Sequence, residues 1–232
     1  MRRILKRIEE RQADYSQAPF FAFLRDPSID VRRRLAFAPH VTHFVLTFSD
    51  LCSLVLPREP ARDRYQELVN ANCLEDRGHW RWFLSDLEEL GSDSVVRFSD
   101  AVKLIWSDAT VRTRKLSYHL VQVGGAEDSL GRLVLVLCIE GAFKMTVRNL
   151  EPVAREFIAV SGKRLNYLGV QHAQAEQSHT LEDSAVQSSL EEIPLTSQEA
   201  ARLCTLVDDS FAFFGAFADE MQDLAQASGR VD

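Results

Sequence analysis

Apolar residues recur every three or four positions along nearly the whole chain, and this spacing limits the fold more than any other feature. Such a period places the apolar side chains on one face of each helix, which must then pack against another helix. Only LVLVLCI (133–139) could be a strand by its period, and no other segment offers it a partner strand. We therefore predict an all-α protein in which 133–139 belongs to a buried helix.

Glycine, proline and capping residues divide this pattern into segments. Gly91 and the Gly124-Gly125 pair are predicted to end two helices, and Thr196 or Ser197 with Glu199 predicts a capping box at the start of the last one. The predicted helices are 31–57 (with Pro39 kinking it or starting its main part), 59–90, about 95–107, 109–122, 126–149, 151–161, 163–181 and 197–227.

No internal repeat is present, and 232 residues suffice for one large core. We therefore expect a single-domain bundle of about seven helices over residues 1–232. Residues 1–17 are expected to form an N-terminal extension, and 184–196 a loop before the last helix.

Composition narrows the classes of partner. The net charge of −7 argues against nucleic-acid binding, which needs a basic surface. No run of 18 apolar residues suggests a membrane span, and the charged start lacks the apolar region of a secretory signal. The four cysteines are widely separated, which is typical of reduced thiols. We expect a cytoplasmic protein with neither a nucleic-acid nor a membrane partner.

The segment HAQAEQSH (172–179) combines two histidines and a glutamate. On a helix, Glu176 would lie about 40° and His179 about 20° around the axis from His172. Imidazole and carboxylate on one stripe are good ligands for iron, manganese or zinc. The alternative is a solvated polar face, because the flanking residues are polar too.

A second acid/histidine group occurs in NANCLEDRGHW (70–80). His79 follows Asp76 by three residues and Glu75 by four, and both spacings bring side chains together on a helix. An acid-x-x-His pair thus occurs twice, as Asp76/His79 and as Glu176/His179. A hydrogen bond on a helix surface would explain each pair equally well.

Glu140 lies inside the most apolar segment of the chain. Seven apolar residues precede it and Gly141-Ala142-Phe143 follow, so its carboxylate is predicted to be buried and must be paired, protonated or bound to a metal. Gly141 would let another group approach closely. A salt bridge to an arginine is the alternative to a metal.

An acid/His helix, a lone Glu in an apolar helix and a His-x-x-x-acid-x-x-His helix, in this order, resemble the heme-oxygenase-like diiron oxidases. The segments FFAFL, RLAFAPHVTHFVLTFSDL and EDRGHWRWFLSDLEELG are also similar to bacterial members of that superfamily, and the resemblance covers about residues 18–225. It implies His79, Glu140, His172, Glu176 and His179 as metal ligands, with Glu140 as the bridging carboxylate.

The resemblance fails at the first carboxylate. Some relatives have a Glu seven residues before the early histidine, and Asn72 stands there in this chain. Asp76 is our candidate for the missing ligand, and Glu75 is the weaker alternative. If neither ligates, the site holds one iron or is degenerate.

What the resemblance implies is a non-heme Fe(II) oxidase or oxygenase, with two ions, or one, and O2 as co-substrate. Its substrate would be a small amine, amino acid or carboxylate, in bacterial specialised metabolism. The residues that would do the catalysis besides the metal ligands are not identified, and a homodimer is left open.

Three rival readings remain. The first is a ferritin-like dimetal protein, with Asp50 as a carboxylate of its first helix. The second is a metal-free enzyme of the same fold, of the thiaminase or quinone-cofactor-synthase type. The third is a non-catalytic helical binding protein. His40, His43 and His119 are expected to be ordinary, partly buried histidines.

Overall fold

The computed structural model describes residues 1–93, 95–176 and 179–227, with the side chains of Glu176 and Glu182 left out. Over these residues the protein is all-α, as predicted, and contains no strand. The α-helices are α1 (Arg2–Tyr15), α2 (Pro19–Arg25), α3 (Val31–Arg34), α4 (Thr42–Asp50), α5 (Arg64–Asp76), α6 (Trp80–Glu89), α7 (Phe98–Trp106), α8 (Val111–Ala126), α9 (Ser129–Ser161), α10 (Val170–Glu176), α11 (Ser184–Glu191) and α12 (Ser197–Ala227). Shorter turns are η1 (Ala38–Val41), a π-helical turn η2 (Leu51–Val55), η3 (Asp108–Thr110) and η4 (Thr180–Glu182).

Helix α9 is the centre of the fold. Asp128 caps it by accepting the Gly131 N–H at 2.8 Å, and Gly162, with φ of 71°, ends it. The predicted division into 126–149 and 151–161 is wrong, because the helix continues through Pro152. Buried apolar residues beyond the proline keep this last part packed. The helix contacts α1, α2, α3, α5, α8, α10 and α12.

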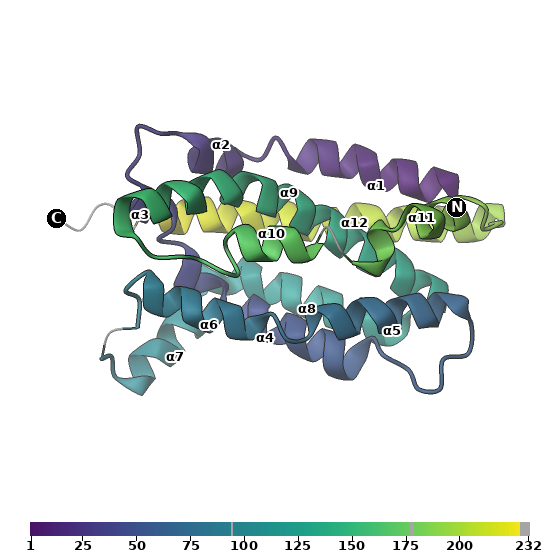
Figure 1. Ribbon diagram of the computed structural model, residues 1–232. Coiled ribbons are helices and arrows are strands. Elements are labelled where there is room, and N and C mark those ends of the chain that lie inside the picture. The colour runs from purple at the N-terminus through teal and green to yellow at the C-terminus, as the bar shows by residue number, and fades with distance from the viewer. Residues whose placement is uncertain (94, 177–178, 228–232) are drawn as a thin grey trace.

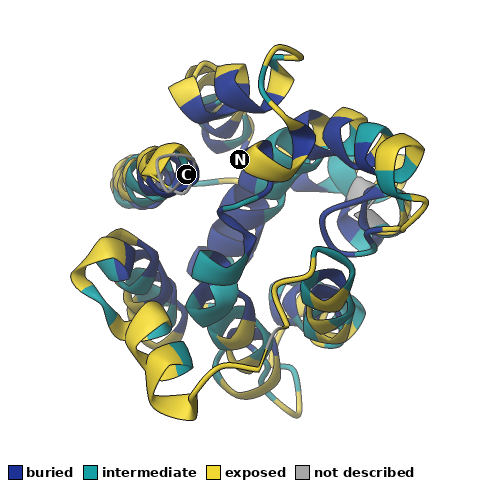
Figure 2. Cartoon of the chain, turned by 90° about the vertical axis from the view of Figure 1, so that its left-hand side faces the viewer, coloured by how far each residue is buried: buried dark blue, intermediate teal, exposed yellow. Residues whose placement is uncertain are grey.

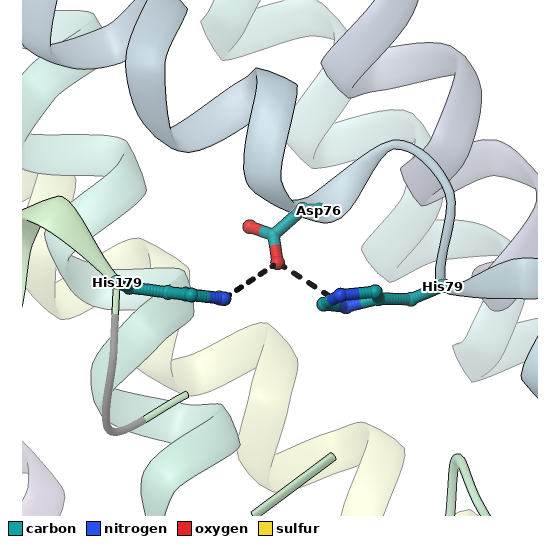
Figure 3. A group of neighbouring side chains, drawn as sticks. All are labelled: Asp76, His79 and His179. Atoms are coloured by element: carbon teal, nitrogen blue, oxygen red, sulfur yellow. Dashed lines mark ion pairs between the residues drawn. The ribbon is translucent and has the colours of Figure 1, made fainter. Parts of the chain in front are cut away.

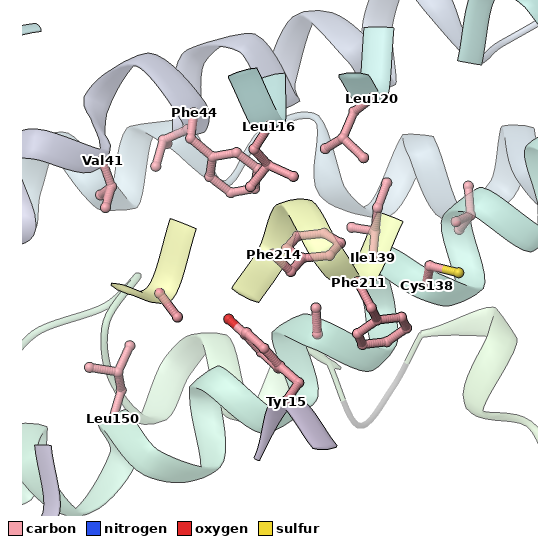
Figure 4. Packing of buried hydrophobic residues seen from close by; sticks show 14 of the residues in the cluster. Tyr15, Val41, Phe44, Leu116, Leu120, Cys138, Ile139, Leu150, Phe211 and Phe214 are labelled. Atoms are coloured by element: carbon pink, nitrogen blue, oxygen red, sulfur yellow. The ribbon is translucent and has the colours of Figure 1, made fainter. Parts of the chain in front are cut away.

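The helices are arranged in two layers (Figure 1). The layer with α1, α2, α9, α10 and α12 faces the layer with α4, α5, α6 and α8, and the long helices run along the same direction. Seen from one end, buried residues face the interior and exposed residues line the outside (Figure 2). Aromatic and aliphatic side chains of α1, α4, α8, α9 and α12 fill the space between them (Figure 4).

Helix α8 passes through the glycine pair that was predicted to end helix 109–122. Gly124 is buried where α8 crosses the π-helical turn η2, and a Cβ there would lie 2.9 Å from Leu56 Cδ2 and 3.3 Å from Leu51 Cδ1. The glycine serves close packing of two helical segments. It does not mark the end of the helix.

Three long predicted helices are broken. The segment 31–57 forms α3, η1, α4 and η2, with a turn over 35–37, and its main helix α4 begins after Pro39. The segment 59–90 forms α5 and α6, which are separated by a turn over 77–79. In the described part of 163–181, the chain forms α10 after a non-helical stretch, and His179 lies just before η4. These breaks raise the number of helical segments above the predicted seven or so, and they change how the histidines meet.

The two segments expected outside the bundle are helical. Residues 2–15 form α1, which packs against α9 and α12, so they belong to the bundle and are not an extension. The predicted loop 184–196 contains α11. The capping box is confirmed with Thr196 as the cap: its N–H and hydroxyl bond the Glu199 carboxylate at 2.8 and 2.7 Å. None of the described helices has both the length and the apolar character needed to cross a bilayer.

Candidate metal centre

Asp76 and His79 meet across the turn that ends α5. The His79 N–H donates to the Asp76 carbonyl at 3.0 Å, so the turn keeps the spacing of three residues that a helix would give. The side chains come together on the inner face, with Asp76 Oδ1 3.4 Å from His79 Nδ1. The predicted pair therefore forms, although it lies at the end of a helix and not inside one.

His179 comes to this pair from the other layer. Its Nε2 lies 3.8 Å from Asp76 Oδ1, on the opposite side of the carboxylate from His79 (Figure 3). Glu75 fixes the segment that carries it, because its carboxylate accepts the Thr180 N–H at 3.2 Å and the Thr180 hydroxyl at 2.6 Å. Glu75 thus points at the backbone of η4.

Among the described residues, Asp76, His79 and His179 form a group that could hold a metal ion. All three are buried, and one ligand atom from each lies within 4.8 Å of the others. With metal–ligand bonds of about 2.1 Å, two ligands of one ion lie roughly 3.0–4.2 Å apart. The measured separations of 3.4 and 3.8 Å fit that range. Two imidazoles and one carboxylate are also the donor set of many non-heme Fe(II) oxygenases.

Burial keeps His79 neutral. Desolvation, helped by the charges of His172 and His179, lowers the pKa of His79 to about 3. The His79 ring stacks on Trp82, with ring centroids 4.2 Å apart. Its buried Nδ1 has no partner with hydrogen-bond geometry among the described residues. A neutral, desolvated imidazole is the form that binds a metal.

Asn72 connects two carboxylates beside this group. Its Nδ2 donates to Asp76 Oδ2 at 2.7 Å and to Glu140 Oε1 at 2.8 Å. Glu140 Oε2 lies 3.7 Å from Nδ1 of His179, the ring nitrogen that does not face Asp76. Glu140 is largely buried, as predicted, and it adjoins the three-residue group without belonging to it.

His172 also adjoins the group. Its ring centroid lies 5.0 Å from that of His79. Its Nδ1 lies 2.8 Å from the Tyr167 carbonyl, and since a carbonyl only accepts, Nδ1 carries the proton and Nε2 the lone pair. Burial lowers the pKa of His172 to about 4.

Asp86 holds the loop that positions His172. Its carboxylate accepts the N–H groups of Asn166 at 2.6 Å and Leu168 at 2.7 Å, on either side of Tyr167. Burial raises the pKa of Asp86 to about 6, although these backbone bonds act in the opposite direction. The network runs from α6 through the loop to α10.

The structure thus brings together most of the predicted site residues, but they come from several helices and the turns beside them and not from one shared helical face. The hypothesis that His172, Glu176 and His179 share one helical stripe is wrong, because α10 ends before His179. The Glu176 side chain lies outside the described residues. Asn72 does occupy the site, as a hydrogen-bond donor to its carboxylates.

Gly141 allows a close approach, as predicted, and the group that approaches is Gln12 of α1. A Cβ at position 141 would collide with the Gln12 amide.

Sequence reasoning missed the parts played by Asp86, Tyr167 and Trp82. Asp86 follows His79 by seven residues, a spacing that returns to the same helical face and could have marked it. Tyr167 acts through its backbone carbonyl, which no side-chain pattern reveals.

An apolar cavity of about 50 Å³ reaches the centre at His172. Phenylalanines of α2, α4, α9 and α12 make much of its wall. The lining side chains with a polar group are Tyr15, Thr146, Tyr167 and His172, and the hydroxyls of Tyr15 and Thr146 lie 3.4 Å apart. The centre therefore borders a small, mostly apolar space with few polar groups.

No protein-family model matches this chain, and no curated protein matches it in sequence.

Proposed function

We propose that the protein is a non-heme iron oxidoreductase that uses O2 on a small amine, amino acid or carboxylate. The observation that carries the proposal is the meeting of Asp76, His79 and His179 in a buried group of the right size for one ion. The order of acid/His pair, central Glu and final histidines supports a heme-oxygenase-like fold as part of the same proposal. A role in bacterial specialised metabolism rests on the resemblance alone.

The residues divide the work as follows. Asp76, His79 and His179 would hold Fe(II), whose open coordination positions let O2 and a substrate meet. Burial keeps His79 neutral and ready to ligate, and Trp82 fixes its ring. The apolar wall beside His172 excludes water and fits the hydrocarbon part of a small substrate. His172 is oriented by Tyr167 and faces this space.

Metal analysis of protein produced without a histidine tag tests the proposal. The wild type should retain iron, and His179→Ala should lose most of it. His119→Ala is the matched control, since His119 stacks on Phe213 and lies 3.3 Å from the Ser210 hydroxyl, outside the group. O2 uptake by the Fe(II)-loaded wild type, with pools of amines, amino acids and carboxylates, should then identify the substrate class.

The rival readings give different results. Wild-type protein that binds no iron, manganese or zinc would favour a metal-free enzyme or a helical binding protein. Equal metal loss in His119→Ala and His179→Ala would mean that the metal does not bind at Asp76, His79 and His179.

A further inference from the structure

We propose that Asn72 limits the metal centre to a single ion, by holding Asp76 and Glu140 with the two N–H groups of its amide. This inference rests on the proposed function, because it concerns the same centre. Beyond the proposed function, it identifies Asn72 as the residue that sets the number of bound ions.

The hydrogen bonds of Asn72 carry the inference. Asn72 is buried, and its Nδ2 lies 2.7 Å from Asp76 Oδ2 and 2.8 Å from Glu140 Oε1. An amide nitrogen has two hydrogens, so these bonds use both. Bonds to carboxylates are stronger than those between neutral groups. Each carboxylate thus has one oxygen engaged by Asn72.

Among the described residues, these bonds leave no suitable place for a second cation between Asp76 and Glu140. Paired ions lie about 3.5–4 Å apart and are held by carboxylates that reach both. Here the amide hydrogens, which carry partial positive charge, lie between the two carboxylates. The described carboxylates that contact this amide, Asp76 and Glu140, can supply at most two negative charges, as many as one divalent ion neutralises.

The orientation of His179 also supports a single bound ion. Its Nε2 faces Asp76 at 3.8 Å, and its Nδ1 faces Glu140 at 3.7 Å. A neutral imidazole has one lone pair, so His179 can ligate one ion. With the lone pair on Nε2, that ion would lie on the Asp76 side and the Nδ1–H would face Glu140. A carboxylate beyond the histidine, on the side away from the ion, is a common arrangement for orienting such a ligand.

The other end of the amide shows what sets its orientation. Asn72 Oδ1 is buried and has no hydrogen-bond partner among the described residues. Turning the amide over would place this oxygen against two carboxylates, which is worse than leaving it unbonded. The carboxylates therefore fix the donor side of Asn72 towards the centre.

Mn(II) titration with electron paramagnetic resonance tests the inference. The wild type should bind one Mn(II) per chain and show the six-line spectrum of an isolated ion. Asn72→Asp has nearly the same shape, but it replaces the donor with a third carboxylate, so it should bind two ions with an exchange-coupled spectrum. Asn72→Ala should still bind one ion, about 10–100-fold more weakly.

Asn70→Asp is the matched control, because it adds the same charge to α5 but contacts Arg58 and Gln66 away from the centre. It should bind one ion. Two coupled ions in the wild type, a measurement that needs no variant, would overturn the inference and leave the proposed function standing. One ion in a folded Asn72→Asp, or full affinity in Asn72→Ala, would also overturn it. If the wild type bound no ion, both this inference and the proposed function would be wrong.

Discussion

At the scale of residues, the centre consists of ionisable groups whose charge is set by burial. His79 is packed against Trp82 and beside the rings of His172 and His179. His172 is enclosed by the rings of Tyr167 and Phe143. Such surroundings disfavour an imidazolium, so both rings stay neutral where an exposed histidine would titrate.

The first prediction concerns pH. Burial lowers the pKa of His79 to about 3 and of His172 to about 4, both below the ordinary 6.5. As the pH falls, these histidines are protonated in the unfolded chain before they are protonated in the folded one. Their contribution to the free energy of unfolding is therefore fully present above pH 6.5 and is lost as the pH falls. The pKa of Asp86 is raised to about 6, so below pH 6 the folded state binds this proton first. Its protonation stabilises the folded state as the pH falls and offsets the loss from one histidine. Between about pH 6 and pH 4, the metal-free protein should lose about 1.4 kcal/mol of unfolding free energy per pH unit from these three groups.

Long-range 1H–15N spectra of the imidazoles check this directly. At pH 5.5 the rings of His79 and His172 should both be neutral, and His172 should carry its proton on Nδ1. Urea unfolding between pH 7 and 5 supplies the free energies. A doubly protonated His172 ring at pH 5.5 would contradict the prediction.

At the scale of elements, contacts decide where helices end and where they continue. The glycines of α8 lie inside a helix because Gly124 meets the segment around Leu51 and Leu56. The chain leaves α5 at Asp76, and the following turn presents His79 to the interior. Glu75, in the last turn of α5, bonds to Thr180 and so places η4 against that helix.

The second prediction compares the two neighbouring glycines. Gly124→Ala should destabilise the protein by about 1–3 kcal/mol, because the new methyl would overlap buried leucines. Gly125→Ala should stabilise it by roughly 0.5–1 kcal/mol, since a Cβ there meets nothing within 4 Å and alanine favours a helix. Urea denaturation of both variants measures the difference. Equal effects would mean that α8 and η2 do not pack this closely.

At the scale of the whole molecule, the candidate centre joins the two layers. Asp76 and His79 come from the α5–α6 side, and His179 comes from the segment between α10 and η4 on the other (Figure 1). An ion held by all three would connect segments about 100 residues apart in the sequence. Unfolding separates these ligands, so the ion binds the folded state.

The third prediction follows from that linkage. Fe(II) or Mn(II) at about 100 times its dissociation constant should stabilise the protein by about 2.7 kcal/mol. For a chain of this length, that raises the melting temperature by roughly 5–11 °C. Differential scanning calorimetry under anaerobic conditions measures the shift. His179→Ala should show little of it, and an equal shift in that variant would place the ion elsewhere.

The sequence by itself determined the all-α class, the buried helix around 133–139, a capping box at Thr196 or Ser197 and the pairing of Asp76 with His79. These depend on local periodicity and short spacings, which neighbouring residues impose on one another. Predicted helix ends failed at Gly124 and Pro152, where packing against other helices outweighs local preference.

Only the tertiary structure decided how the centre is built. His179 reaches Asp76 because Glu75 holds Thr180, and Asn72 reaches Glu140 because α5 packs on α9. These contacts join residues 68 to 105 positions apart. A helical wheel describes neighbours within one element, so it predicted a common stripe for His172 and His179 that the end of α10 removes.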